Sequence, residues 1–505
     1  MSFNTFIAAA ALGMHCAIAF AHTPAYTAGS APLPTAIHDE AYRLTTSSPL
    51  GMLLLPRTSS GTARLAYAHE GGRLMRVQSP EKEDGLHLTS RGLYSTSRWQ
   101  LYGEFAYTRT YADSVAWLLS ETPEDGLPYY FASPRKGNFD LEKYELKGTF
   151  AADAGRHFTA GASADVVYSK GARGNDPRSA TESFVSRYYA FFGIKTSALA
   201  ITAMGGLGYG TRDNDIVYNN SDNDRPLRPD MMAYEFMGFG LNRRTQQYQN
   251  RTLMTDINSA HAALQASLQT SSLRLWARGE YTGRKNKIRR SRITNVEEST
   301  LTTYFTTGYS LTLGADYRFE SGAKLQTIVY AKAVNGHDKL VNILQGQKNY
   351  IYSQSSFGAN ATLAHRAHLF GAALSYSREK RNEGSSEHIY EQKALDASLS
   401  WTARRELRGC FLLYGASQGL VLPTATLQYP PLQENIFTTH VALPMLRYHN
   451  TSQGHTALRL GAGRAVGSTD VALSLDYRMA YSLGSRTDAI SGTRHHVSAA
   501  VTLTF

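Results

Sequence analysis

The segment HVSAAVTLTF, which ends at Phe505, alternates between apolar side chains on one face and small or polar side chains on the other. A period of two is typical of a β-strand with one apolar face. Residues 471–481 repeat the pattern and carry Asp476 and Arg478 on the polar face. Because a charged side chain avoids lipid, we expect the apolar face to meet a membrane and the other face to line a lumen.

The same alternation recurs along the chain, for example in residues 98–107, 273–281 and 305–319. Such runs are far longer than the strands of soluble sheets, which peak at about 5–6 residues. After residue 21 we find no apolar stretch of about 18 residues or more, and the mean hydropathy of −0.33 is too polar for a helical membrane protein. The sequence therefore predicts an all-β fold, a single transmembrane antiparallel up-and-down β-barrel.

Connection lengths give the topology, because such barrels have short periplasmic turns and long outer loops. Tight turns are predicted at Ser95-Thr96, Asp153-Gly155, Thr196-Ser197, Thr270-Ser272, Glu320-Gly322, His365-Ala367, Arg404-Glu406, Pro430-Gln433 and Ala465-Gly467. Long connections are predicted at residues 111–138, 169–182, 212–254, 285–302, 335–349, 381–390 and 482–494. Strict alternation of the two kinds gives about 20 strands if residues 420–429 form a strand, and 18 if this segment, interrupted by Pro423, is a loop.

Three regions follow from these patterns. Residues 1–21 combine a short apolar run with a small-residue end and are predicted to be a signal peptide. Residues 22–60 are predicted to be a periplasmic or lumen-inserted segment with an apolar patch at residues 52–55. Residues 61–505 form the predicted barrel, in which Phe505 ends the closing strand on the periplasmic side and serves as the terminal assembly signal.

Charged side chains fall on both the inner and the outer side of the predicted wall. Those expected to line the lumen are Arg274, Arg278, Glu280, Asp316, Arg318, Asp476 and Arg478. Their mixed signs argue against a strongly ion-selective pore. The basic run predicted outside the membrane contains Arg284, Lys285, Lys287, Arg289, Arg290 and Arg292, where it would meet lipid headgroups or an acidic partner, or remain a solvated loop tip.

Residues that could support chemistry do not converge. Most histidines are scattered, and the adjacent His495 and His496 would point to opposite faces of a strand, so no metal site and no cofactor is predicted. The glycine-rich segment 205–210 does not open a helix, as a phosphate-binding loop would. We therefore predict no catalytic residue and no nucleic-acid partner. The net charge of +11 fits either attraction to anions or ordinary surface charge.

The segment YSKGARGNDPRSATESF (168–184) resembles a recurrent loop of a Bacteroidota-type outer-membrane β-barrel family of unknown function. The stretch SPLGMLLLP, the strand YELKGTF and the terminal aromatic are similar in order. The resemblance implies the barrel fold and the outer-membrane compartment of a Gram-negative bacterium. Within the loop, Asn175, Asp176, Pro177 and Arg178 favour a fixed turn, with ligand contact as the alternative.

Three functions are compatible with this sequence. The first is a channel or accessory component of nutrient uptake across the outer membrane. The second is a non-conducting scaffold for a surface complex, with residues 111–138 and 212–254 as docking loops. An outer-membrane enzyme is the third. The predicted partners are outer-membrane lipid, the barrel-assembly machinery, and a neighbouring uptake receptor or surface lipoprotein.

Overall fold

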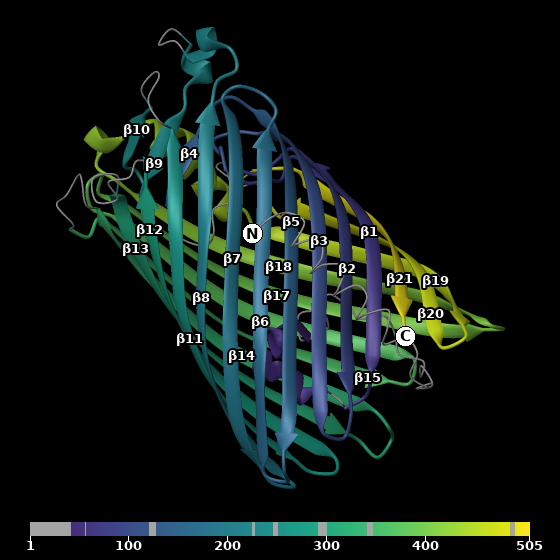
Figure 1. Ribbon diagram of the computed structural model, residues 1–505. Coiled ribbons are helices and arrows are strands. Elements are labelled where there is room, and N and C mark those ends of the chain that lie inside the picture. The colour runs from purple at the N-terminus through teal and green to yellow at the C-terminus, as the bar shows by residue number, and fades with distance from the viewer. Residues whose placement is uncertain are drawn as a thin grey trace.

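The alternating runs form one antiparallel sheet that closes on itself in the computed structural model (Figure 1). The structure describes residues 42–55, 57–120, 128–224, 228–245, 251–290, 300–340, 347–484 and 490–505. The 18 strands of the wall are β1 (Ser60–Gly72), β2 (Lys82–Ser95), β3 (Trp99–Val115), β5 (Gly137–Ala154), β6 (Phe158–Arg173), β7 (Arg178–Lys195), β8 (Leu199–Val217), β11 (Thr252–Gln269), β12 (Leu273–Arg289), β13 (Thr300–Arg318), β14 (Lys324–Leu340), β15 (Tyr350–His365), β16 (His368–Glu383), β17 (His388–Leu407), β18 (Cys410–Gln428), β19 (Gln453–Val466), β20 (Thr469–Ser482) and β21 (Thr493–Thr504). β1 pairs with β21, and this pairing closes the barrel, which confirms the predicted fold.

The two faces of the wall differ as the alternation requires. On β21, Val497 and Val501 are exposed on the outside, whereas Ser498, Ala500 and Thr502 face inward and are buried. Large apolar side chains cover the outside of other strands as well, such as the 70% exposed Leu207. No helix of the described residues is long and apolar enough to cross a membrane.

The wall contains 18 strands and not 20, because residues 420–429 continue β18 and do not form a strand of their own. β18 pairs with β19 only as far as Val421, so Pro423 lies where no strand on that side needs an N–H donor. On its other side Pro423 is opposite Ala394 of β17. A proline is tolerated at such an unpaired edge, which the sequence pattern alone does not reveal.

Seven of the nine predicted tight turns join neighbouring strands. The other two are corrected: Arg404–Glu406 belongs to β17, and Pro430–Gln433 lies in a long connection at the opposite end. The predicted long connection 169–182 is also corrected, because β6 and β7 run through it and leave only residues 174–177 between them. These strand ends are polar on both faces, so polarity made them look like a loop. We call the end with the short turns the periplasmic end and the other the outer end.

At the outer end, several connections fold over the barrel. A small sheet of β4 (Tyr129–Ala132), β9 (Tyr234–Met237) and β10 (Asn242–Arg244) lies beside a π-helix, Thr438–Ala442, that leads into α5, Leu443–His449. Short 3-10 helices η3 (Ser221–Asp224), η4 (Pro229–Met231) and η5 (Pro431–Gln433) complete these connections. We call β4, β9, β10, the π-helix and α5 the outer cover.

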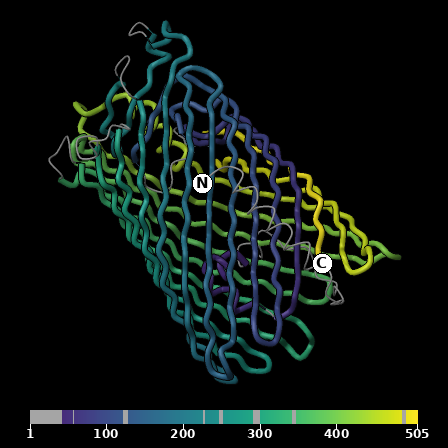
Figure 2. Tube along the Cα trace, in the orientation of Figure 1, coloured from purple at the N-terminus to yellow at the C-terminus, as the bar shows by residue number. Residues whose placement is uncertain are grey.

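Residues 42–55, the lumen segment, lie inside the ring of strands toward the periplasmic end (purple in Figures 1 and 2). One helical turn over residues 42–46 is followed by the 3-10 helix η2, Pro49–Leu54. Pro49 begins η2, where its missing N–H costs no hydrogen bond. A Cβ atom on Gly51 would stand 1.8 Å from the carbonyl oxygen of Thr45, so only glycine allows the two turns to pack together.

Candidate functional site: the lumen and its two covers

The lumen segment is fastened to the wall mainly by Arg278 of β12. This side chain is 1% exposed, and its Nη1 donates to the carbonyl oxygen of Thr45 at 2.8 Å. Its Nη2 donates to the carbonyl oxygen of Leu44 at 2.5 Å and to the Ser47 hydroxyl at 3.1 Å. The planar guanidinium thus satisfies three acceptors of a short segment with one side chain.

Three other strand residues bind the backbone of the lumen segment. Arg274 donates to the carbonyl oxygen of Leu54 at 2.5 Å. Gln265 of β11 donates to that of Leu50 at 3.1 Å, and Lys147 of β5 to that of Thr46 at 2.5 Å. β5 and β11 are separated by three strands of the wall, so the segment is held from more than one side.

Apolar contacts also hold the lumen segment against the wall. Leu50 and Met52 pack with inward side chains that include Phe191, while Leu54 packs with Trp276 and Ile328. The rings of Phe191 and Trp276 lie against glycines of neighbouring strands: a Cβ on Gly161 would stand 2.2 Å from the first ring, and one on Gly314 2.1 Å from the second. The rings can therefore lie close to the wall and leave space for the segment.

The outer cover is tied to the wall by buried polar groups. The hydroxyl of Tyr129 donates to the carboxylate of Asp338, a fully buried residue of β14. Asp338 also accepts the backbone N–H groups of Asn349, at 2.7 Å, and Tyr350, at 2.9 Å. Burial, reinforced by this carboxylate, raises the pKa of Tyr129 well above its usual value. Three donors thus compensate the charge that Asp338 carries into the interior.

Further contacts hold the helical part of the outer cover. Nε2 of His388 on β17 lies 2.7 Å from the Thr438 hydroxyl, and both residues are fully buried. The ring of His440 stacks on Trp117 at 4.7 Å between centroids. On α5, His449 bonds to the hydroxyl of Tyr390 through Nδ1. Burial, with Arg76 and Arg381 nearby, lowers the pKa of His449 to about 3.

The apolar side of the outer cover packs as one cluster. Phe236 of β9 meets Phe437 edge to face at 5.1 Å, and Phe239 meets Phe437 at 5.0 Å. The cluster includes inward side chains of the wall such as Tyr304 and Tyr350. The scaffold hypothesis treated residues 111–138 and 212–254, which contain β4, β9 and β10, as docking loops. The aromatic runs YYFA (129–132) and YEFMGF (234–239) were the signal that they are buried.

The seven predicted lumen charges all lie on wall strands, on the positions that alternate with the apolar outer face. Arg274 and Arg278 hold the lumen segment. Glu280 lies 3.5 Å from Nε of Arg278 and accepts the Ser310 hydroxyl at 3.1 Å. These residues therefore form part of one connected polar group beneath the lumen segment.

The other predicted lumen charges are not brought together with them. Asp316 accepts the Gln326 amide at 3.0 Å, and Arg318 is exposed at the end of β13. On β20, Asp476 is buried and ion-paired with Arg459, while Arg478 is exposed. The interior thus carries charged groups of both signs in separate places.

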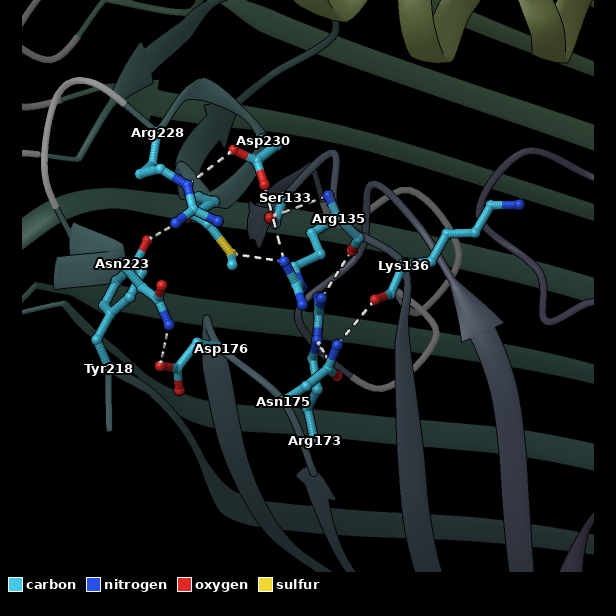
Figure 3. A network of polar contacts seen from close by, with 11 residues as sticks. Ser133, Arg135, Lys136, Arg173, Asn175, Asp176, Tyr218, Asn223, Arg228 and Asp230 are labelled. Carbon is cyan, nitrogen blue, oxygen red and sulfur yellow. Dashed lines mark hydrogen bonds and ion pairs between the residues drawn. The ribbon is translucent and has the colours of Figure 1, made fainter. Parts of the chain in front are cut away.

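The motif Asn175–Arg178 joins three outer connections (Figure 3). Asp176 accepts the backbone N–H groups of Asn219 and Asn220, each at 3.0 Å, and the side-chain amide of Asn223 at 2.9 Å. Burial acts to raise the pKa of Asp176, but these hydrogen bonds outweigh it and hold the pKa below its usual value.

The remaining members of the motif extend this network. The amide of Asn175 donates to the carbonyl oxygen of Lys136 at 2.9 Å, and Arg178 forms an ion pair with Asp176 at 3.2 Å. The bond from Asp176 to Pro177 is cis. The motif thereby links its own turn to Lys136 and to the connection at residues 219–223.

The predicted basic loop is largely strand. Arg284, Lys285, Lys287 and Arg289 belong to the outer end of β12, and only Arg290 follows it in the described residues. Arg289 pairs with Asp256 at 3.0 Å, and Arg290 pairs with Glu235 at 2.9 Å. The sequence prediction of a loop was wrong here because β12 continues above the membrane, where its side chains are mainly polar on both faces and no longer alternate regularly with apolar ones. Arg292 lies outside the described residues, as do the predicted signal peptide and residues 22–41.

His495 and His496 lie on opposite faces of β21, as alternation requires. His495 is on the outer face, where it bonds to Tyr477 at 2.8 Å and Thr493 at 2.9 Å. Within the described part of the chain, no group of three or more histidine, cysteine, aspartate or glutamate side chains is arranged to hold a metal ion. Phe505 exchanges backbone hydrogen bonds with Gly61 of β1, at 2.7 and 3.0 Å.

A closed barrel with an apolar outside and a polar, partly filled inside defines a transmembrane β-barrel of the kind found in Gram-negative outer membranes. Residues 49–505 match the model of a family of unknown function, DUF6850, and the chain belongs to this family. None of the curated proteins matches the sequence.

Several solved barrels resemble the structure in shape. The outer membrane transporter YddB from Escherichia coli is 7% identical, with 89% of this chain and 81% of that chain covered and a TM-score of 0.38. The ferric preacinetobactin receptor BauA from Acinetobacter baumannii is 8% identical, with 89% and 80% covered and a TM-score of 0.37. The toluene transporter TodX from Pseudomonas putida is 10% identical, with 92% and 93% covered and a TM-score of 0.32.

Proposed function

We propose that this protein is a gated uptake channel of the Gram-negative outer membrane, closed at rest by its own lumen segment. The observation that carries the proposal is the way this segment is held. Arg274, Arg278, Gln265 and Lys147 bind its backbone carbonyl groups, so water can replace each bond when the segment leaves. Such a fastening is strong enough to occlude a lumen and still reversible.

The interior supports passage of a polar solute once the segment moves. Inward positions carry both acidic and basic groups, such as Glu280 and Arg478, and a mixed lining favours hydrated solutes without strong selection by charge. The outer cover must also open, which would break the buried hydrogen bonds from Tyr129 to Asp338 of the wall and between His449 and Tyr390. The barrel would act alone or as an accessory to a neighbouring uptake receptor.

Planar-bilayer recording of the purified barrel tests the proposal. We expect the wild type to be closed for most of the recording, with brief openings. The double variant Arg274→Ala and Arg278→Ala should stay open longer, because it loses the two arginines that hold residues 44–54. Lys332→Ala is the matched control, since Lys332 is exposed on the inner face of β14 and, among the described residues, forms no hydrogen bond or ion pair with the lumen segment. Identical recordings for the double variant and the wild type would overturn the gating role.

A non-conducting scaffold is the second candidate, and the extensive burial within the outer cover favours it. The cluster around Phe236 and Phe437 resembles a protein core more than a mobile lid. A scaffold predicts silence in both recordings, with surface proteins retained on the folded barrel. The barrel-assembly machinery, a surface lipoprotein partner and a Bacteroidota origin stay predictions from the sequence.

A further inference from the structure

Two rows of side chains on the outside of β12, β13 and β14 carry positive charge near the outer end of the wall. In the first row, Lys287 is opposite Thr303, and Thr303 is opposite Lys339. Neighbouring strands are about 4.8 Å apart, so the two lysines stand about 10 Å from each other with the threonine between them. The register thus places two lysines on either side of one threonine on the outer surface.

The second row, one step closer to the membrane centre, shapes this spot. Lys285 is opposite Phe305, and Phe305 is opposite His337. The rings of Phe305 and His337 stack at 5.4 Å, and the ammonium of Lys339 lies 5.6 Å from the centre of the Phe305 ring. This cation–π contact restrains the Lys339 side chain beside Thr303.

The lysines of these rows are available for a ligand. Among the described residues, Lys285, Lys287 and Lys339 have no ion pair or hydrogen bond through their ammonium groups. Asp256 of β11 lies opposite Lys287 in the register but is paired with Arg289 at 3.0 Å. Outward-facing basic side chains at the outer end of other strands include several that are paired with acids. Arg109 pairs with Asp140, Lys170 with Glu142, and both Arg378 and Lys393 with Glu391.

The position of the site along the barrel axis indicates which kind of ligand can reach it. Below the two rows, the outward rings of Tyr281 and Tyr309 meet at 5.4 Å. Leu311 and Leu313 follow on the same face, 49% and 44% exposed. Aromatic side chains mark the membrane interface of outer-membrane barrels and apolar ones the hydrocarbon region. The lysines therefore stand at the level of lipid headgroups and point into the lipid, where a soluble protein partner would not reach.

We propose that Lys287, Thr303 and Lys339 form a site for a phosphate group of an outer-leaflet glycolipid, with Lys285 as a flanking contact. The phosphate would lie over Thr303 and take hydrogen bonds from both ammonium groups and from the hydroxyl. Charge-assisted bonds of this kind are the strong ones in phosphate recognition. The site rests on the outer-membrane location proposed above but not on conduction.

Native mass spectrometry of the folded full-length barrel, titrated with diphosphoryl lipid A in detergent, tests the site. Each lysine near an anionic lipid surface contributes about 1 kcal/mol. The variant Lys287→Gln and Lys339→Gln should therefore need about 30-fold more lipid for half occupancy, which corresponds to about 2 kcal/mol. Lys332→Gln, on the inner face of β14, is the matched control and should bind like the wild type. Thr303→Val should give a smaller loss, and the heat-dependent mobility of each variant checks that it is folded.

Equal retention of lipid A by the double variant and the wild type would overturn the site. So would equal retention of a lipid A that lacks both phosphates, because binding would then come from the acyl chains. If inorganic phosphate at the same concentration displaces the lipid, the site recognises free phosphate and the assignment to a lipid is wrong. Conductance does not enter any of these measurements, so the result is independent of the gating proposal.

Discussion

The substitution Arg278→Ala should release the lumen segment without unfolding the barrel. It removes hydrogen bonds from one charged donor to the carbonyl oxygens of Leu44 and Thr45 and to the Ser47 hydroxyl. A hydrogen bond that involves a charged group contributes about 1.5 kcal/mol at the low end of its range. The two bonds to the carbonyl oxygens alone amount to about 3 kcal/mol, so the released fraction should rise at least about 100-fold.

Cysteine labelling measures this released fraction. Thr46 is buried between the lumen segment and the wall, so a Thr46→Cys reporter reacts with a maleimide only when the segment is free. The native residues Cys16 and Cys410 are replaced by serine so that only the reporter reacts. The labelling rate should rise about 100-fold in Arg278→Ala and remain unchanged in Lys332→Ala. A rate within about twofold of the unsubstituted reporter would show that apolar packing alone holds the segment, and would refute the polar fastening.

Three further outcomes follow from other parts of the molecule. Asp176→Ala should increase hydrogen exchange in residues 218–224 and leave the melting of the barrel unchanged, because it removes the acceptor for that connection; faster exchange throughout would contradict a local role. Because burial lowers the pKa of His449 to about 3 while an exposed histidine titrates near about 6.5, the outer cover should be fully stable above that pH and lose about 2 kcal/mol by about pH 5. Proteolysis within residues 438–449 should report this loss, and His449→Gln should make it independent of pH. Phe505→Asp should reduce the yield of folded barrel far more than Thr504→Asp, since the Phe505 ring lies over Gly61 on the outside of the seam, and equal yields would count against this register.

The sequence was sufficient for the features that depend on local alternation. Period-two runs placed the wall strands, and turn residues such as Thr196 and Gly322 placed most of the periplasmic connections. Residues 420–429 were misjudged because the tolerance for Pro423 depends on where β19 stops pairing, and that partner is about 30 residues away in the chain. Alternation also ceases to be informative above the membrane, where both faces of β6 and β7 are polar.

The outer cover could not be predicted, and the sequence left open whether residues 22–60 enter the lumen, because both arrangements depend on contacts between distant segments. The apolar patch at residues 52–55 indicated burial, but its partner Trp276 is more than 200 residues away. Similarly, Tyr129 and Asp338 are 209 residues apart and meet only once the barrel has closed. Inward arginines were expected to line the lumen, and only the structure places Arg278 beneath the backbone that it holds.

Gly161 and Gly314 lie beneath the rings of Phe191 and Trp276, so the space left for the lumen segment depends on very small changes of side-chain volume. A single methyl group on Gly161 or Gly314 would collide with the ring of Phe191 or Trp276 and tilt it toward the axis. The ring would then press on the lumen segment, although the side chains that bind the segment's backbone would stay the same. Family members that carry alanine at either position should therefore differ in how readily the segment leaves, while their polar fastening remains the same.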